Sequence, residues 1–237
     1  MNKTLKHFLF AGFAFVPFAA FSQLSDPARP GVNPFRDDQN ARNVTNKPDE
    51  LNAEGSPFLL DDFIPMEVTL VQGGVFTGVK IKLNVVDNEI FFTTESGQIL
   101  STATPVKRLR FNRVKEDESG MEEVILESIG AAINSPGTPI YQVLADGKAK
   151  LLKQIIISYS DVRKYPEGTM ARVFKKKSAY FASVNGQAPV KIDKSKSDVL
   201  SVLKDKQKEV SSFIDKEKLK CKTEEDISKV FSYYSSL

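Results

Sequence analysis

Apolar and polar residues alternate with a period of two along much of residues 55–193. The alternation is clearest from Val79 to Val85, where every second residue is apolar, and it is typical of strands that bury one face of a sheet. Pairs of turn-forming residues interrupt it at short intervals. These pairs are Gly73-Gly74, Asp87-Asn88, Ser96-Gly97, Asp146-Gly147 and Asn185-Gly186. Because strands joined by short connections usually pair with each other, the pattern predicts an antiparallel meander.

The middle of this region contains one ambiguous segment and one predicted hairpin. The periodicity of residues 122–129 fits a helix and a strand equally well, so both remain open. Asp146-Gly147 has the composition of a type I′ turn and lies between the apolar segments 141–144 and 151–157. The two segments are therefore expected to form the strands of a hairpin.

Residues 171–174 and 180–184 are expected to form two further strands, because both are rich in aromatic and β-branched residues. Asn185-Gly186 favours the backbone conformation of a two-residue hairpin turn. The chain should therefore reverse there and continue into a last short strand that contains Val190 and Ile192.

At Ser195 the apolar period changes from two to about 3.6, which is typical of amphipathic helices. Ser195 with Asp198, and Thr223 with Asp226, have the spacing of helix-capping boxes. The first predicted helix has Val199, Leu203, Lys206, Val210 and Phe213 on one side, and the second has Ile227, Val230, Phe231 and Tyr234. Two short helices of this kind need a partner surface, and the β-rich region is the expected one.

The first residues have the composition of a secretory signal peptide. Two lysines precede the apolar run 8–21, which is shorter than the roughly 20 apolar residues of a membrane span. Ala20 and Ser22 are small residues two apart, so cleavage is expected between Ser22 and Gln23. The mature chain is therefore expected in the periplasm or the medium, without a transmembrane span.

The chain divides into four predicted parts: a signal peptide (1–22), a flexible polar leader (23–54), a β-rich domain (55–193) and a helical segment (194–237) packed on that domain. The expected fold class is α+β and mainly β. It is an antiparallel meander or sandwich, or a barrel-like sheet, with two C-terminal amphipathic helices packed on it.

Composition excludes several chemistries. His7 is the only histidine and lies in the predicted signal peptide, so the mature chain cannot hold a Ser-His-Asp triad, a Cys-His dyad or a His-based zinc site. No Gly-rich phosphate loop occurs, and Asp87-Asn88-Glu89 lacks the longer alternating pattern of a calcium loop, so we expect neither a cofactor nor a metal. Cys221 is the only cysteine and is interpreted as a small buried side chain. Without the signal peptide, 31 basic residues balance 30 acidic ones, which argues against nucleic-acid binding.

Two short motifs resemble catalytic patterns. Asp61-Asp62 is a carboxylate pair of the kind used in glycoside cleavage, but adjacent residues of an extended chain point to opposite faces. Ser201 and Lys204 have the S-x-x-K spacing of penicillin-recognising enzymes, whose other motifs are missing here. We therefore assign no catalytic residue.

One basic segment with nearby aromatic residues is the candidate binding surface. It consists of Arg172, Lys175, Lys176, Lys177 and Tyr180. A basic strand edge with aromatic residues could bind an anionic glycan, a lipid head group or an acidic envelope protein. The competing interpretation is that the lysines only protect a strand edge from aggregation while the aromatic residues belong to the core.

The chain resembles an uncharacterised family of secreted bacterial β-rich proteins with a C-terminal helical segment. The resemblance covers residues 55–237 and rests on Gly55-Ser56-Pro57-Phe58-Leu59, Tyr141-Gln142-Val143-Leu144, Asp146-Gly147-Lys148, Leu151-Leu152-Lys153 and Tyr233-Tyr234-Ser235-Ser236-Leu237. It implies a location and an architecture but no activity.

Together these features predict a non-catalytic extracytoplasmic protein with a binding or structural role. Its partner would be an envelope protein or an anionic glycan, and its oligomeric state is open. The alternatives are a histidine-free glycan hydrolase that uses carboxylates and a carrier of apolar ligands inside a barrel.

Overall fold

The computed structural model describes residues 33–35, 42–43, 53–115, 118–163, 168 and 170–237. The predicted signal peptide and most of the predicted leader lie outside these residues. The strands are β1 (Arg42–Asn43), β2 (Ala53–Glu54), β3 (Ile64–Leu70), β4 (Val75–Asn84), β5 (Glu89–Thr93), β6 (Ile99–Ser101), β7 (Val106–Val114), β8 (Met121–Glu127), β9 (Ile140–Ala145), β10 (Ala149–Arg163), β11 (Met170–Val184) and β12 (Val190–Ile192).

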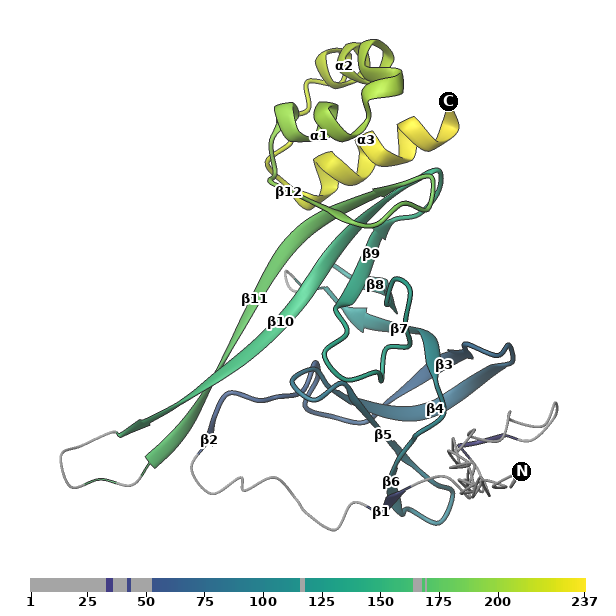
Figure 1. The fold of residues 1–237 in the computed structure, drawn as a ribbon, viewed down its shortest axis with the longest axis vertical. Coiled ribbons are helices and arrows are strands. Elements are labelled where there is room, and N and C mark those ends of the chain that lie inside the picture. Colours follow the sequence, from purple (N-terminus) through teal and green to yellow (C-terminus); the bar gives the residue numbers. More distant parts are fainter. Residues whose placement is uncertain (1–32, 36–41, 44–52, 116–117, 164–167, 169) are drawn as a thin grey trace, which may run out of the picture.

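These strands form one curved, open sheet (Figure 1). Their order is β1-β6-β5-β4-β3-β7-β8-β9-β10-β11-β12, and β2 pairs separately with β11. The predicted fold class is thereby confirmed: the chain is mainly β, with helices at its C-terminal end. From β3 to β12 the sheet is a meander with one rearrangement, since β7 pairs with β3 rather than with β6, while the short β1 and β2 pair with β6 and β11. Residues 121–127 form a strand, which settles most of the ambiguous segment.

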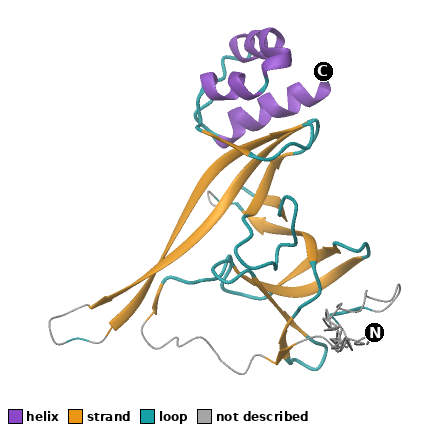
Figure 2. Cartoon of the chain, in the orientation of Figure 1, coloured by secondary structure: helices purple, strands orange, loops and turns teal. Residues whose placement is uncertain are grey.

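The helices gather at one end of the sheet, against β9 and β10 (Figures 1 and 2). They are α1 (Lys196–Val202), a 3-10 turn η2 (Lys204–Lys206), α2 (Gln207–Lys216) and α3 (Glu224–Ser236). Both predicted caps are confirmed, because Ser195 accepts a hydrogen bond from the Asp198 backbone and Thr223 accepts one from the Asp226 backbone. The caps place the start of α1 and α3 where the sequence predicts.

The prediction of one continuous helix from Ser195 to Phe213 is wrong, because the helix breaks at Leu203. The Leu203 side chain at the break is fully buried. In the 3-10 turn that follows, the carboxylate of Asp205 lies within 3.0 Å of the Tyr234 hydroxyl on α3, which donates to it. Burial and this hydrogen bond raise the pKa of Tyr234. The helix break at Leu203 is thus followed directly by a polar contact with α3.

Two other local predictions are corrected by the structure. The predicted strands 171–174 and 180–184 are parts of one strand, β11, which pairs residue by residue with β10. Asp146 does not adopt the positive φ of a type I′ turn, and the β9–β10 loop has three residues, 146–148. The turn at Asn185-Gly186 is confirmed: φ is +51° and +72°, and Gln187 N donates to Val184 O.

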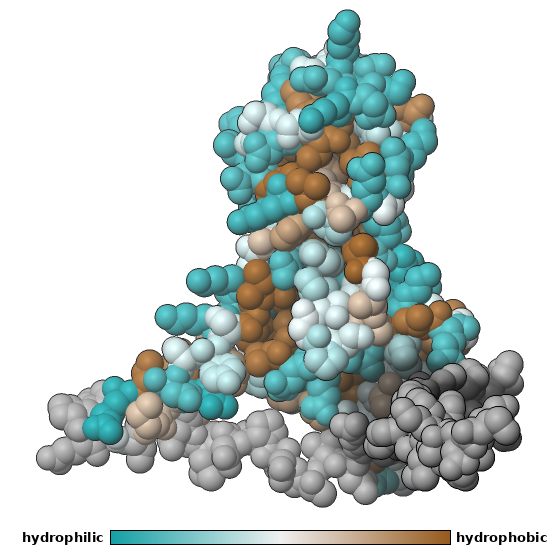
Figure 3. Space-filling model, viewed as in Figure 1, coloured by the Kyte–Doolittle hydropathy of each residue, from teal (hydrophilic) through white to brown (hydrophobic). Residues whose placement is uncertain are grey.

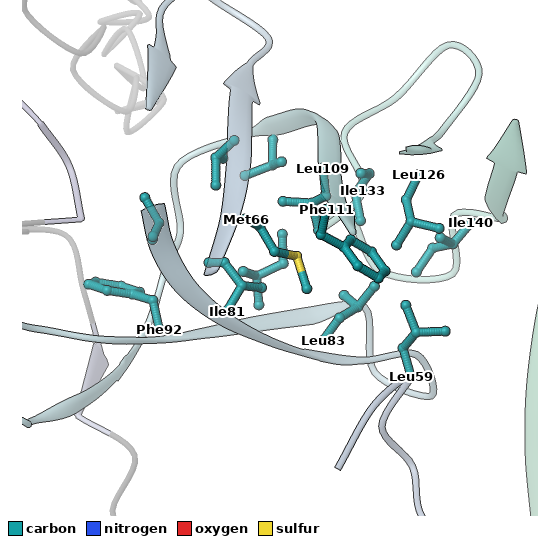
Figure 4. Close-up of a cluster of buried hydrophobic side chains, with 14 of the residues drawn as sticks. Leu59, Met66, Ile81, Leu83, Phe92, Leu109, Phe111, Leu126, Ile133 and Ile140 are labelled. Carbon is teal, nitrogen blue, oxygen red and sulfur yellow. The ribbon is translucent and has the colours of Figure 1, made fainter. Parts of the chain in front are cut away.

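The larger hydrophobic core lies inside the curve of the sheet, between β3–β5 and β7–β10 (Figure 4). Its fully buried side chains include Ile81, Phe92 and Leu109. Phe35, which lies in the predicted leader, is only 4% exposed and packs edge-on against Phe92. An isolated apolar residue among polar neighbours gives no periodic pattern, so the sequence did not indicate this contact.

A second core joins the helices to the sheet. Ile227, Val230 and Phe231 of α3 are fully buried there together with Leu151 of β10. Cys221 is also fully buried in this cluster, as predicted, and burial raises the pKa of its thiol. The helices thus complete the fold over one end of β9–β12.

One polar contact fixes the first turn of α3 to the two longest strands. The Glu224 carboxylate accepts hydrogen bonds from Lys153 on β10 (2.7 Å) and from the Tyr180 hydroxyl on β11 (2.6 Å). Burial opposes ionisation of Glu224, but these donors outweigh it, and the pKa of Glu224 is lowered. Lys194 lies 4.9 Å from the centre of the Tyr180 ring and adds a cation–π contact.

We expect the protein to lose stability as the pH falls below the ordinary glutamate pKa of about 4.3. Glu224 has a lowered pKa in the folded state, so its contribution is complete above the unfolded value and is lost as the pH falls through the folded value. In the Glu224→Gln variant, the urea concentration at the midpoint of unfolding should fall less over this pH range than in the unmodified protein. Glu225→Gln, one residue along the same turn, is the control, and equal profiles for the two variants would contradict this role.

Candidate binding surface on the β10–β11 arm

The end of the β10–β11 pair farthest from the helices extends away from the rest of the molecule (Figure 1). We call this two-stranded part, Ile156–Arg163 of β10 and Met170–Lys177 of β11, the arm. β9 accompanies β10 only as far as the pair Ile140–Ile155. Beyond that pair every β10 residue from Ser158 to Arg163 is exposed. Because two-stranded ribbons are only marginally stable in water, the arm depends on its own cross-strand contacts.

One face of the arm carries a cluster of aromatic and charged side chains, which we call the aromatic face. Tyr159 and Phe174 are directly opposite each other, with ring centres 5.8 Å apart. The Arg172 guanidinium lies 4.3 Å from the centre of the Tyr159 ring and forms two hydrogen bonds, of 2.8 and 3.0 Å, with Asp161. These bonds lower the pKa of the Asp161 carboxyl. Arg172 is thus already engaged within the arm.

The opposite face carries two lysines and is called the lysine face. Lys175 lies opposite Ser158, and Lys177 lies opposite Ile156. Both lysines are exposed. Between Ile156 and Arg163 and between Met170 and Lys177, Asp161 is the only acidic residue, and the alternation of the strand places it on the aromatic face. Glu54 of β2 pairs with Val173 and so also lies on the lysine face, where the two lysines outnumber it and leave a net positive charge.

The structure divides the five residues of the predicted surface among three places. Lys175 and Lys177 share the lysine face, while Arg172 and Lys176 are on the aromatic face, where Lys176 lies opposite Ile157. Tyr180 is eight residues from Arg172 along β11, about 26 Å at the usual rise per residue, and its hydroxyl binds Glu224 beneath the helices. The arm brings four of the five residues together, whereas Tyr180 belongs to the helix contact.

The edge of β11 is partly covered along the arm. β2 pairs with it in parallel at Arg172 and Val173. Gly55, directly after β2, has φ +76°, and a Cβ built there would lie 3.1 Å from the backbone oxygen of Phe174. Glycine therefore permits this close approach. In the part of the chain that the structure describes, no strand covers the corresponding edge of β10.

A shallow pocket of about 170 Å³ lies beside Ile140, the first residue of β9, where the arm begins. Its lining includes Thr138 just before β9, Ile140 at the start of β9, and Ile155 and Ile157 on β10. Asn88 completes one wall and donates hydrogen bonds to the carbonyls of Ile133 and Thr138, which hold this loop in place. Hydrophobic surface is visible midway along the β10–β11 pair in Figure 3, with polar side chains around it.

The residues of the two catalytic-looking motifs do not form a site. Asp61 and Asp62 are exposed. The Ser201 hydroxyl donates to the backbone oxygen of Asp198, one turn earlier in α1, at 2.7 Å. Lys204 is exposed in the following 3-10 turn. Both motifs are thus accounted for by local structure.

Glu127 is the one fully enclosed carboxylate among the described residues, and it is paired with cations. Glu127 on β8, only 4% exposed, accepts hydrogen bonds from Lys150 (2.6 Å) and Arg108 (2.8 Å). Asp146 joins the same group, 3.3 Å from Lys150. Among the described residues no cluster of three or more His, Cys, Asp or Glu side chains is placed to hold a metal ion. Nor does any helix of the described ranges have the length and apolar character to cross a membrane.

Comparisons of the chain with protein-family models, with curated proteins and with solved structures gave no match. The resemblance to a secreted bacterial family therefore stays a prediction from the sequence motifs.

Removing the aromatic contact should loosen the arm without unfolding the protein. Tyr159→Ser removes a cross-strand aromatic pair and a cation–π contact, together worth about 1 kcal/mol, so amides of the arm should exchange about fivefold faster. The global unfolding midpoint should not change, because neither Tyr159 nor Phe174 belongs to a hydrophobic core. Hydrogen exchange followed by mass spectrometry measures both regions, with Ser160→Ala as the control in the same strand. If amides of the two cores exchanged faster by the same factor as those of the arm, the arm would not be an independent unit.

Proposed function

We propose that this chain is a non-catalytic extracytoplasmic protein, located in the bacterial envelope or secreted, that binds a partner through the arm. The observation that carries the proposal is the arm itself. It continues the β10–β11 pair beyond β9, keeps Tyr159 about half exposed, and gathers four of the five residues of the basic segment. Neither hydrophobic core requires an extension of this kind.

The lysines protect only one of the two open edges of the arm. Lysines guard a strand edge most effectively when they lie on the edge that is open. They lie on β11, whose edge pairs with β2 at Arg172–Val173 and with β12 at Tyr180–Ala182, but with no described strand at Lys175–Lys177. The open edge of β10 has no lysine between Ile156 and Arg163. The edge of β10 is therefore left unprotected and available to a partner, and the lysine face beside it favours an anionic one.

The alternative functions have less support. A glycan hydrolase needs two carboxylates that face each other across a substrate, but Glu127 and Glu224 each bind neighbouring cations. A carrier needs a cavity of roughly 300 Å³ or more, and the space inside the curved sheet is filled by core side chains such as Ile81 and Leu109. Binding through an exposed element fits the described residues better than either alternative.

Photo-cross-linking in intact cells of the source organism tests the proposal. A photoreactive phenylalanine derivative in place of Tyr159 should give a covalent adduct with a defined partner, because Tyr159 is 49% exposed on the arm. The same derivative in place of Val190, 57% exposed, is the control. Val190 lies on β12, which pairs with β11 at the helix end.

Three results would bear on this proposal. An adduct from Tyr159 that is missing from Val190 supports it. Equal adducts from both positions, or none from Tyr159, would contradict binding through the arm. Fractionation of the same cells and N-terminal sequencing of the purified chain test the location, since export predicts a mature chain that begins at Gln23.

A further inference from the structure

The open edge of β10 has the properties of a site for strand addition. From Ile156 to Arg163 no strand of the described residues pairs with this edge. Its sequence, IISYSDVR, is rich in β-branched and aromatic residues and contains neither Pro nor Lys. An exposed strand edge presents unpaired N–H and C=O groups, and natural proteins usually block such edges with Lys, Pro or a bulge. This edge has none of these in its described residues, and its Asp161 is neutralised by Arg172 within the arm.

The pocket beside the arm lies in line with this edge. β9 occupies the edge of β10 up to the pair Ile140–Ile155, and the pocket is lined by both of these residues and by Ile157. A strand added beside the arm would continue the line of β9 and would end at the pocket. One apolar side chain at that end of the added strand could enter the 170 Å³ space.

The lysine face indicates the charge of the added strand. Strands lie about 4.8 Å apart, so an added strand would lie about 10 Å from β11. Lys175 is opposite Ser158, a small residue over which the long lysine side chain can extend towards the added strand. Lys177 is two residues further along the same face. Since side chains of a strand alternate between faces, carboxylates at every second position of the added strand would meet both lysines.

We propose that an extended acidic segment of a partner protein adds as a strand to the open edge of β10, with carboxylates beside Lys175 and Lys177 and an apolar side chain in the pocket. This inference rests on the proposed binding function and specifies its partner. Main-chain hydrogen bonds to β10 supply affinity, while the lysines and the pocket supply selectivity. Apolar residues at the intervening positions would pack beside Tyr159 on the aromatic face.

A synthetic peptide tests the proposal on the complete mature chain. The probe is a fluorescently labelled peptide of eight residues, with glutamate at alternate positions, valine between them and leucine at the end. It should bind more tightly than a scrambled peptide of the same composition and than the peptide with lysine in place of glutamate. Fluorescence anisotropy measures the dissociation constants. Hydrogen exchange should show new protection of the β10 amides from Ile156 to Arg163.

Charge reversal on the arm gives the matched comparison. The double variant Lys175→Glu/Lys177→Glu should weaken binding of the acidic peptide by about tenfold or more, because it replaces two attractive contacts by repulsive ones. The control Lys107→Glu/Lys191→Glu changes the net charge equally at exposed lysines of β7 and β12, and its affinity should stay within about twofold. Equal losses in the two double variants would show that only the overall charge matters and would overturn the proposal.

A pocket variant tests the apolar anchor separately. Thr138→Phe places a larger side chain in the wall of the pocket. It should weaken binding of the leucine-containing peptide and leave a peptide with serine at that position unaffected. Circular dichroism and thermal unfolding of each variant confirm that the fold is retained. An equal effect on both peptides would remove the pocket from the proposal.

The outcomes distinguish this inference from the proposed function. Adducts from Tyr159 in cells, combined with no preference for the alternating acidic peptide, would retain binding through the arm and overturn strand addition. If Tyr159 gave no adduct and the acidic peptide were not preferred, both binding through the arm and strand addition would be overturned. Self-association of the chain that protects the same β10 amides would assign the edge to a second copy of this chain and would also overturn the proposal.

Discussion

The antiparallel pairing of β10 with β11 is the interaction on which the rest of the structure depends. Both strands have 15 residues, and they pair from Ala149–Val184 to Arg163–Met170 without a break. One end of the pair supports the helices through Leu151 and Lys153, the middle contributes Ile155 to the larger core, and the other end forms the arm. A single ladder of hydrogen bonds therefore joins two hydrophobic cores and the candidate binding surface.

Much of the fold follows from local sequence patterns, and what does not follow depends on contacts between distant residues. Alternation and turn residues correctly predict the meander and the turn at Asn185-Gly186, and the capping residues correctly place α1 and α3. The pairing of β7 with β3 has no local signature, because the hydrophobic alternation of β7 fits either neighbour equally. The buried position of Phe35 and the helix break at Leu203 are likewise set by surfaces far away in the sequence.

The candidate surface was predictable in composition but not in arrangement. The basic segment is evident in the sequence, yet a run of three lysines and a serine interrupts the apolar alternation, which is why two strands rather than one were expected there. Pairing with β10 keeps this polar stretch extended and distributes its lysines between two faces. The open edge and the adjacent pocket exist because pairing of β9 with β10 stops at Ile140 and Ile155, and only the three-dimensional structure specifies this position.

The contact between Tyr180 and Glu224 also constrains how the sequence can change over evolutionary time. Tyr180 is held beneath α3, so the number of residues from it to Lys177 and Lys175 determines which face each lysine occupies. Replacing a residue in this stretch alters one side chain. Inserting or deleting a single residue moves every β11 side chain of the arm to the opposite face while the β10 side chains stay in place, because the side-chain period of a strand is two. Natural variants of this protein should therefore differ here by substitution while keeping the length of the stretch unchanged.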